Sequence, residues 1–300
     1  MVLLNTMIFN LISVAFITLM ERKILGYTQM RLGPNKVGIL GLLQPFSDAI
    51  KLYSKEKNLP NFSTSLPFFF SPCVSLTISM FVWICLPYYL NIISLKIGIM
   101  ILLSVLGMSV YPILIAGWSS NSIYSLLGGI RSLAQTISYE VSLTFILFMN
   151  LFICASLNMY MLISTQKIMS FSTFLLSFFM WLISMTAELN RTPFDFAEGE
   201  SELVSGFNTE YSSGSFAIIF MSEYMMIMFF SVFTSVLFFG VFFNMNFFFM
   251  TLMLMFLLIW TRSTFPRYRY DKLMNLCWKI ILPLSIINIF FSILVLLLTL

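Results

Sequence analysis

Residues 224–261 read YMMIMFFSVFTSVLFFGVFFNMNFFFMTLMLMFLLIWT, a run without one charged side chain. As a single helix this run would be roughly 57 Å long, nearly twice the thickness of the apolar core of a bilayer. The triplet Asn244-Met245-Asn246 offers a turn inside the run. A spanning helix needs about 20 apolar residues. The run therefore predicts two membrane-spanning helices, at about 214–243 and 246–262.

The composition extends this prediction to the whole chain. Hydrophobic residues make up 59% and charged residues 9%, and the mean hydropathy is +0.96, whereas soluble domains have about 45–50% apolar and about 25% charged residues. Further uncharged runs predict spans at about 2–20, 66–88, 97–117, 134–160, 169–188 and 280–299. The sequence thus predicts an all-α polytopic membrane protein with eight transmembrane helices in a single membrane domain, 1–300. A net charge of +4 is too small to indicate a nucleic-acid partner.

The basic residues predict the topology. With eight spans, the loops after the odd-numbered spans share one side, and they hold every Lys and Arg except Lys96 and Lys167. The positive-inside rule puts these loops on the negative side of the membrane and both termini on the other.

One segment outside the spans is amphipathic. Residues 42–57, LLQPFSDAIKLYSKEK, repeat apolar side chains at helical spacing opposite Ser47, Asp48, Lys51 and Lys55. Pro45 suits a first helical turn. We expect a helix that lies in the membrane interface.

The histidine and cysteine content limits the chemistry. The chain has no histidine, and Cys73, Cys85, Cys154 and Cys277 are scattered without a C-x-x-C motif. An iron–sulfur cluster normally needs four clustered thiolates, so we expect none on this chain. Buried free thiols are the simpler interpretation.

The acidic residues gather in one segment. Residues 187–211, AELNRTPFDFAEGESELVSGFNTEY, hold half of the 12 acids and a single base, Arg191. The acids are Glu188, Asp195, Glu198, Glu200, Glu202 and Glu210. Their mutual repulsion raises the pKa of some carboxyls, which suits proton exchange near neutral pH. Apolar residues alternate with the acids, which favours packing of this acidic loop, 188–213, against protein over a solvated surface loop. If the segment is helical, Asp195, Glu198 and Glu202 share one face.

Two further acids fall inside predicted spans. Glu140 lies eight residues after Ser132, the expected N-cap of its helix, and Glu223 lies a similar distance into the sixth span. Each could simply pair with a base and hold helices together. Three buried acids, counting Glu188, favour proton or cation transfer instead.

The basic loops permit two interpretations. In the first, their charge serves membrane topology alone. Alternatively, the arginines balance the acids or line a polar cavity; these arginines are Arg22, Arg31, Arg191, Arg262 and Arg269.

Two motifs carry a resemblance to a known family. GLLQPFSDAIKLYSKE (41–56) and PFDFAEGESELVSG (193–206) resemble signatures of the respiratory-chain NADH:ubiquinone oxidoreductase chain 1 family, which has relatives in membrane-bound hydrogenases. ERKILGYTQMRLGPNKVG (21–38) and FPRYRYDKLMNLCWK (265–279) add support. The resemblance covers essentially the whole chain, and the Phe and Met bias resembles animal mitochondrially encoded members.

The resemblance implies a fold, a place and partners. The family has eight transmembrane helices, five of them arranged like an antiporter half-unit, and forms the heel of a membrane arm in the mitochondrial inner membrane. The odd-numbered loops then face the matrix and both termini face the intermembrane space. The implied partners are the quinone-site and iron–sulfur subunits of the peripheral arm, small and antiporter-like membrane subunits, and membrane lipid.

The resemblance also implies an activity and residue roles. Ubiquinone is the substrate, and this chain carries no FMN, no cluster and no redox centre of its own. The implied quinone-tunnel residues are Arg22, Arg31, Phe46, Asp48, Arg191, Phe207 and Arg269. The implied proton-coupling residues are Glu140, Glu188, Asp195, Glu198, Glu200, Glu202, Glu210 and Glu223.

Two other classes of function stay open from the residues alone. Buried acids fit an ion or proton transporter, or a channel subunit, without a redox role. The other class is a scaffold that only docks a peripheral arm. It predicts that replacing the acids by neutral residues disturbs assembly but leaves activity unchanged.

Overall fold

The computed structural model describes residues 2–87, 96–154, 156–166, 175–197, 199, 206–240 and 245–299. All the regular secondary structure in these ranges is helical. Six of the described helices are long and apolar enough to cross a membrane. They cover Ser65–Ile84, Gly98–Ser119, Ile123–Phe152, Ser213–Phe239, Met245–Thr264 and Tyr270–Leu294. The predicted class, an all-helical polytopic membrane protein, is confirmed at this level.

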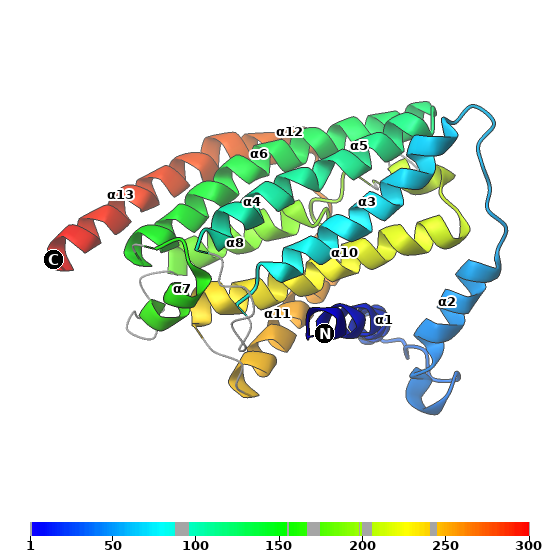
Figure 1. Cartoon of the computed structure of the whole chain (residues 1–300), viewed down its shortest axis with the longest axis horizontal. Helices are drawn as coiled ribbons and strands as arrows, with labels where there is room; N and C mark the ends of the chain where they lie inside the picture. The colour runs from blue at the N-terminus through cyan, green and yellow to red at the C-terminus, as the bar shows by residue number, and fades with distance from the viewer. Residues whose placement is uncertain are drawn as a thin grey trace.

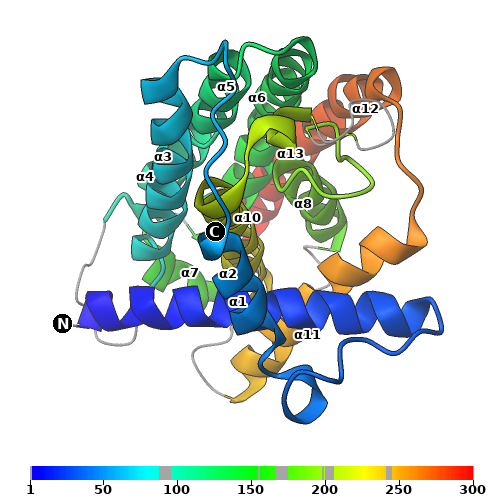
Figure 2. The same cartoon turned by 90° about the vertical axis from the view of Figure 1, so that its right-hand side faces the viewer.

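The helices form one bundle that a further helix crosses. In Figure 1, α3 (Ser65–Ile84), α6 (Ile123–Cys154) and α10 (Ser213–Thr234) run alongside α4 (Gly98–Met108) and α5 (Val110–Ser119), which follow each other end to end. The helix α1 (Val2–Thr28) is seen nearly end-on in Figure 1 and lengthwise in Figure 2, so it crosses the bundle steeply.

The remaining helices pack around α6 and α10. The helix α6 contacts α5, α8 (Leu175–Glu188) and α13 (Leu282–Thr299). The helix α10 contacts α1, α3 and α11 (Met245–Thr264). Two short helices, α7 (Met159–Gln166) and α12 (Tyr270–Leu276), lie at the ends of longer ones. α6 and α10 are thus the two helices around which the others pack.

The fourth predicted span begins earlier than the sequence indicated. The helix α6 starts at Ile123, and Ser132 lies inside it with its hydroxyl donating to the carbonyl of Gly129 (2.8 Å). Ser132 is therefore not an N-cap. Glu140 lies about 26 Å along the helix at about 1.5 Å per residue, more than twice the expected depth.

The last span also begins earlier, with α12 at Tyr270. It continues through a π-helical turn, Cys277–Ile281, into α13. The basic residues Lys272 and Lys279 are consequently on a helix and not in a loop.

The core is built from large aromatic side chains. Trp181 of α8 contacts Phe233 of α10 (ring centroids 5.6 Å apart), and Phe229 stacks on Phe233 (5.6 Å). All three are fully buried. Lipid tails are as apolar as these rings, so close van der Waals packing stabilises such a core more than the hydrophobic effect does.

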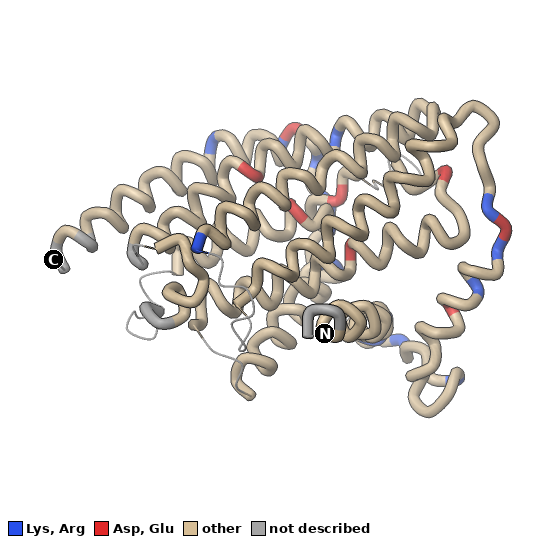
Figure 3. The backbone as a smooth tube through the Cα atoms, viewed as in Figure 1, with Lys and Arg blue, Asp and Glu red and all other residues tan. Residues whose placement is uncertain are grey.

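A tight turn places α2 (Gln44–Ser54) beside α1. Gly41 has φ +75°, and a β-carbon there would lie 2.0 Å from the carbonyl oxygen of Pro34, so only glycine fits. Arg22 of α1 then reaches Asp48 of α2, with Nη1 and Oδ2 2.5 Å apart. Figure 3 shows that the charged residues gather toward the end of the molecule that carries α2.

Candidate functional site

A cavity that contains both charged and apolar side chains lies inside the bundle. It encloses about 940 Å³ of empty space, counting the part that opens to the outside. Its polar lining consists of Ser71, Ser75, Ser79, Ser109, Thr136, Ser222, Glu188, Asn190, Arg191 and Glu223. We call it the central cavity. Helices α3, α5, α6 and α10 and the segment after α8 all contribute to its wall, so residues far apart in sequence meet there.

Two carboxyl groups face the central cavity from different helices. Glu188 ends α8 and is 8% exposed, and its Oε2 has no hydrogen-bond partner in the part of the chain that the structure describes. Glu223 lies on α10, and its charge acts on Arg191. Glu140 of α6 also acts on Glu188 by charge repulsion. Glu140 and Glu188 therefore interact, and Glu223 lines the same cavity as Glu188.

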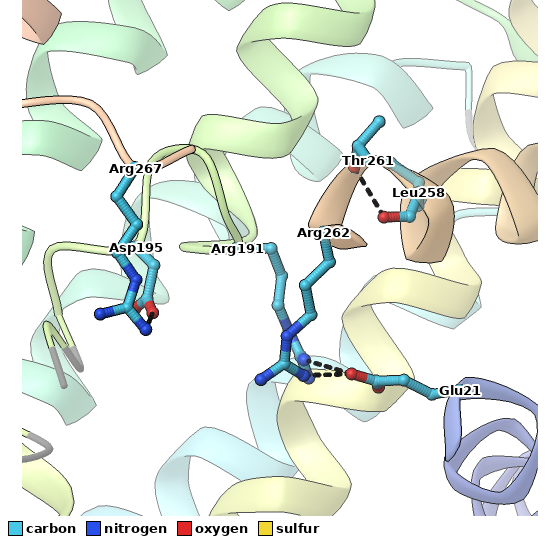
Figure 4. A network of polar contacts seen from close by, with 7 residues as sticks. All are labelled: Glu21, Arg191, Asp195, Leu258, Thr261, Arg262 and Arg267. Carbon is cyan, nitrogen blue, oxygen red and sulfur yellow. Dashed lines mark hydrogen bonds and ion pairs between the residues drawn. The ribbon is translucent and has the colours of Figure 1, made fainter. Parts of the chain in front are cut away.

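Beside the central cavity lies an ion-pair network that we call the Glu21 cluster, formed by Glu21, Arg191 and Arg262 (Figure 4). Nη1 of Arg191 lies 3.3 Å from Oε1 of Glu21, and Arg262 contacts the same oxygen. The Glu21 side chain is only 6% exposed. One carboxylate thus joins α1, α11 and the segment after α8.

Arg191 is held by more than the ion pair. Its guanidinium lies 4.7 Å from the centre of the Tyr224 ring, within the range of a cation–π interaction. Burial by itself lowers the pKa of Arg191. The Glu21 carboxylate, and after it Tyr224 and Glu223, raise the pKa by a larger amount, so the net shift is upward. Arg191 therefore stays charged.

A second, smaller cavity adjoins the Glu21 cluster. It holds about 340 Å³ of empty space and is lined by Glu21, Arg191 and Arg262 together with Thr186, Leu189, Ile227, Leu258 and Ile259. Leu189 and Arg191 line both cavities. A permanently charged arginine thus lines both cavities.

The segment after α8 is fixed by hydrogen bonds from α6. The amide Nε2 of Gln135 donates to the carbonyls of Ala187 (2.9 Å) and Phe194 (2.8 Å). The segment before α12 covers it, where the backbone N–H of Tyr268 donates to Pro193 (3.0 Å). These contacts hold Glu188 and Arg191 in place.

Tyr211 lies just before α10 and contacts Ser71 of the cavity wall. Its ring stacks on Phe68 (centroids 4.2 Å apart), and its hydroxyl lies 2.9 Å from Oγ of Ser71. Burial raises the pKa of Tyr211, although the hydrogen bond to Ser71 acts in the opposite direction. Tyr211 is therefore a neutral hydrogen-bonding group.

The chain was compared with known proteins. The family model for NADH dehydrogenase matches residues 1–293. NADH-ubiquinone oxidoreductase chain 1 of Aedes aegypti is 51% identical over 285 residues, which cover 94% of this chain and 91% of the relative. The protein of the same name from Locusta migratoria is 52% identical over 288 residues (94% and 91%), and that from Phascolarctos cinereus 48% over 286 residues (92% and 90%).

The chain belongs to the NADH dehydrogenase family. The resemblance carried by residues 41–56 and 193–206 is confirmed at the level of the family.

The residues that this family resemblance implied for a quinone tunnel do not form one cluster. Arg22, Phe46 and Asp48 meet where α1 and α2 touch, with Phe46 half exposed beside Phe16 (6.2 Å). Arg191 and Phe207 line the central cavity. Arg31 is exposed, and Arg269 pairs with exposed Asp271 (3.1 Å).

The acidic loop is described only in part. Glu198, Glu200 and Glu202 lie outside the described residues. Asp195 is at a non-helical position, and its Oδ2 lies 3.9 Å from Arg267 (Figure 4). Glu210 is half buried in a 3₁₀ turn, Gly206–Glu210. Among the described residues, no group of three or more cysteines and acids could hold a metal ion.

Sequence reasoning missed several residues of the site. Glu21, Tyr224 and Gln135 are not among the residues that the sequence singled out. A signal existed for Glu21, because it is an acid directly followed by Arg22 and Lys23 on the basic side. Nothing local marks Tyr224 or Gln135, whose partners are distant in sequence.

Proposed function

We propose that this chain is a core membrane subunit of proton-pumping NADH:ubiquinone oxidoreductase, which it serves without catalysing a reaction alone. In this proposal it forms part of the ubiquinone passage and couples quinone reduction to proton translocation. The observation that carries the proposal is Arg191, which pairs with Glu21 and lines both the smaller cavity and the central cavity, where Glu188 and Glu223 lie. The curated relatives bear the name of this enzyme.

The proposed topology has eight spans in one membrane domain. The helices α1 and α8 would join the six apolar spans. Residues 169–174 of the fifth predicted span lie outside the described residues. Lengths of 27 residues for α1 and 32 for α6 exceed the ~20 needed, which suits strongly tilted spans. The odd-numbered loops would face the matrix of the mitochondrion and the termini the intermembrane space, with five spans arranged like an antiporter half-unit.

The mouth of the quinone passage would lie where α1 and α2 meet. The helix α2 exposes Phe46 and Ile50, and Leu43 just before it is exposed as well. An apolar face beside lysines suits the membrane interface. The proposed passage uses Arg22, Arg31, Phe46, Asp48, Arg191, Phe207 and Arg269. Ubiquinone would enter from the lipid and reach a headgroup pocket that a peripheral-arm subunit completes.

Electrons would come from a partner subunit. Reducing ubiquinone to ubiquinol takes two electrons and two protons, and this chain has no histidine and no cluster motif to deliver them. The proposed donor is an iron–sulfur subunit of the peripheral arm, and FMN is likewise bound elsewhere.

The coupling step follows from electrostatics. A change of charge on the quinone side acts on Arg191 and Glu21, and Arg191 in turn acts on Glu223. Buried carboxyls without a counter-charge exchange protons with water in a polar cavity. Protons would then pass among the acids toward small and antiporter-like membrane subunits. The proposed set is Glu140, Glu188, Asp195, Glu198, Glu200, Glu202, Glu210 and Glu223.

The test replaces two acids separately in the assembled enzyme, as Glu188→Gln and Glu202→Gln. We expect each variant to lower the number of protons pumped per electron, or to slow coupled NADH:quinone turnover. The measurement is quinone-dependent NADH oxidation together with proton uptake in sealed vesicles. Glu56→Gln is the matched control, because Glu56 is an exposed acid outside the acidic loop. Full turnover and full pumping in both acid variants would contradict the coupling role.

A second measurement separates this function from an ion transporter or a scaffold. After mild extraction, the chain should migrate in a large assembly with inhibitor-sensitive NADH:quinone reductase activity, and a photoreactive quinone analogue should label it. Migration as a free 34.6 kDa chain without this activity would favour the transporter. Normal activity but poor assembly in variants whose acids are replaced by neutral residues would favour the scaffold.

A further inference from the structure

Gly107 of α4 faces the carboxyl group of Glu140 on α6. A β-carbon at position 107 would lie 2.7 Å from Oε1, 3.6 Å from Cδ and 3.8 Å from Oε2 of Glu140. The first distance is shorter than any ordinary van der Waals contact of a β-carbon. The carboxyl group thus occupies the space that a side chain at position 107 would need.

Glycine has a cost at this position. It lies inside α4, one residue before the end of that helix, and glycine is less favourable than alanine in a helix interior. At Gly41 and Gly117 the nearest atoms to an added β-carbon are backbone atoms, so close approach of the chain accounts for them. At Gly107 the nearest atom belongs to an ionisable side chain instead.

The surroundings of Glu140 indicate what this contact does. Glu140 is half buried, while Ile137 and Val141 on the same helix and Ser104 on α4 are exposed. A glutamate side chain has three rotatable bonds, so without a groove its carboxyl could turn outward toward these neighbours. The groove at Gly107 keeps the carboxyl against α4, on the protein.

We propose that Gly107 is a positioning residue, which sets the place of the Glu140 carboxyl and thereby its separation from Glu188. The inference rests on the proposed coupling role of Glu140. Proton transfer depends on the distance between donor and acceptor, so displacement of one carboxyl slows the transfer without removing an acid.

The test is Gly107→Ala in the assembled enzyme. The atom that the new methyl group meets is the end of a flexible side chain, so the protein folds and the carboxyl moves. We expect coupled proton pumping to fall at least two-fold at an unchanged amount of assembled enzyme. Gly129→Ala is the matched control, because it also puts alanine into a helix, and its β-carbon has ordinary contacts of 3.6 Å or more.

A rescue separates positioning from a general packing defect. Glu140→Asp shortens the side chain by one methylene and makes room for the methyl group of Gly107→Ala. Each single variant should pump poorly, and the double variant should recover at least two-fold over Gly107→Ala. If Gly107→Ala fails to assemble, recovery of assembly in the double variant supports the inference, and its absence overturns it.

The outcomes also distinguish the inference from the function on which it rests. Normal pumping by Glu140→Gln would remove Glu140 from the proton path and overturn the coupling role at this position. Impaired pumping by Glu140→Gln with normal pumping by Gly107→Ala, or without rescue by Glu140→Asp, would overturn only the role of Gly107.

Discussion

Glu21 and Arg22 are neighbours on α1, and each forms an ion pair with another element, which permits a direct comparison. The Glu21 side chain is 6% exposed and is bound by Arg191, itself 19% exposed. Arg22 and Asp48 are 52% and 33% exposed. We predict that Glu21→Gln destabilises the docking of α1 far more than Arg22→Gln does.

The burial sets the expected magnitudes. Removing one partner of a buried ion pair costs about 3–5 kcal/mol, because the other charge stays buried without compensation. Arg262 is 41% exposed and regains water, so we take the lower limit of about 3 kcal/mol. An exposed pair such as Arg22–Asp48 contributes less than about 1 kcal/mol.

Protection of a buried thiol measures this difference. Cys85 is buried in the same core cluster as Val14 and Ile17 of α1, and we expect opening of this core at α1 to expose the thiol to a reagent. A loss of about 3 kcal/mol raises the labelling rate roughly 100-fold, and a loss below 1 kcal/mol raises it less than about 5-fold. Mass spectrometry measures the labelled fraction of the peptide that contains Cys85. Equal labelling rates in the two variants would refute the argument from burial.

Three further predictions follow from the same contacts. Gln135→Leu leaves the carbonyls of Ala187 and Phe194 without their donor, which should cost about 2 kcal/mol and speed amide hydrogen exchange in 187–197 roughly 30-fold. Tyr211→Phe keeps the stacking on Phe68 but loses the hydrogen bond to Ser71, so thermal unfolding should show a loss of only about 1 kcal/mol in the free energy of unfolding. Tyr211→Ala, which also loses the stacking, should lose more. The raised pKa of Arg191 means that its stabilisation is complete below the ordinary pKa of an arginine and is lost only above the raised pKa. The labelling of Cys85 in Glu21→Gln relative to the native chain should therefore stay constant between about pH 6 and 9.

The fold class could be predicted because it depends on local composition. Uncharged runs of about 20 residues have few stable alternatives to a spanning helix. The run 224–261 illustrates this, since one described helix ends before Gly240, at φ +55°, and the next begins at Met245.

The start of α6 could not be predicted because tertiary contacts decide it. Gly128, Gly129 and Arg131 resemble the end of an apolar run, and Ser132 resembles a cap. In the fold, Gly129 lies close to Gly117 of α5, so small residues there serve helix packing and the helix continues through them. Small residues at this place fit either a helix end or a close helix–helix contact, and only the neighbouring helix decides between the two.

The pairing of charges shows the same limit at the site. The acidic loop contains one base, and its position suggests that Arg191 neutralises the acids around it. Arg191 instead binds Glu21, 170 residues away in sequence, and Arg262 binds the same carboxylate from a separation of 241 residues. Because its nearest base is engaged elsewhere, Glu188 has no ion-pair partner among the described residues. The concentration of acids in the sequence thus located the site, whereas the long-range pairs determine which carboxyl stays unpaired in the central cavity. For that reason we expect replacement of Glu188 to disturb proton exchange, and replacement of Glu21 to disturb the docking of α1.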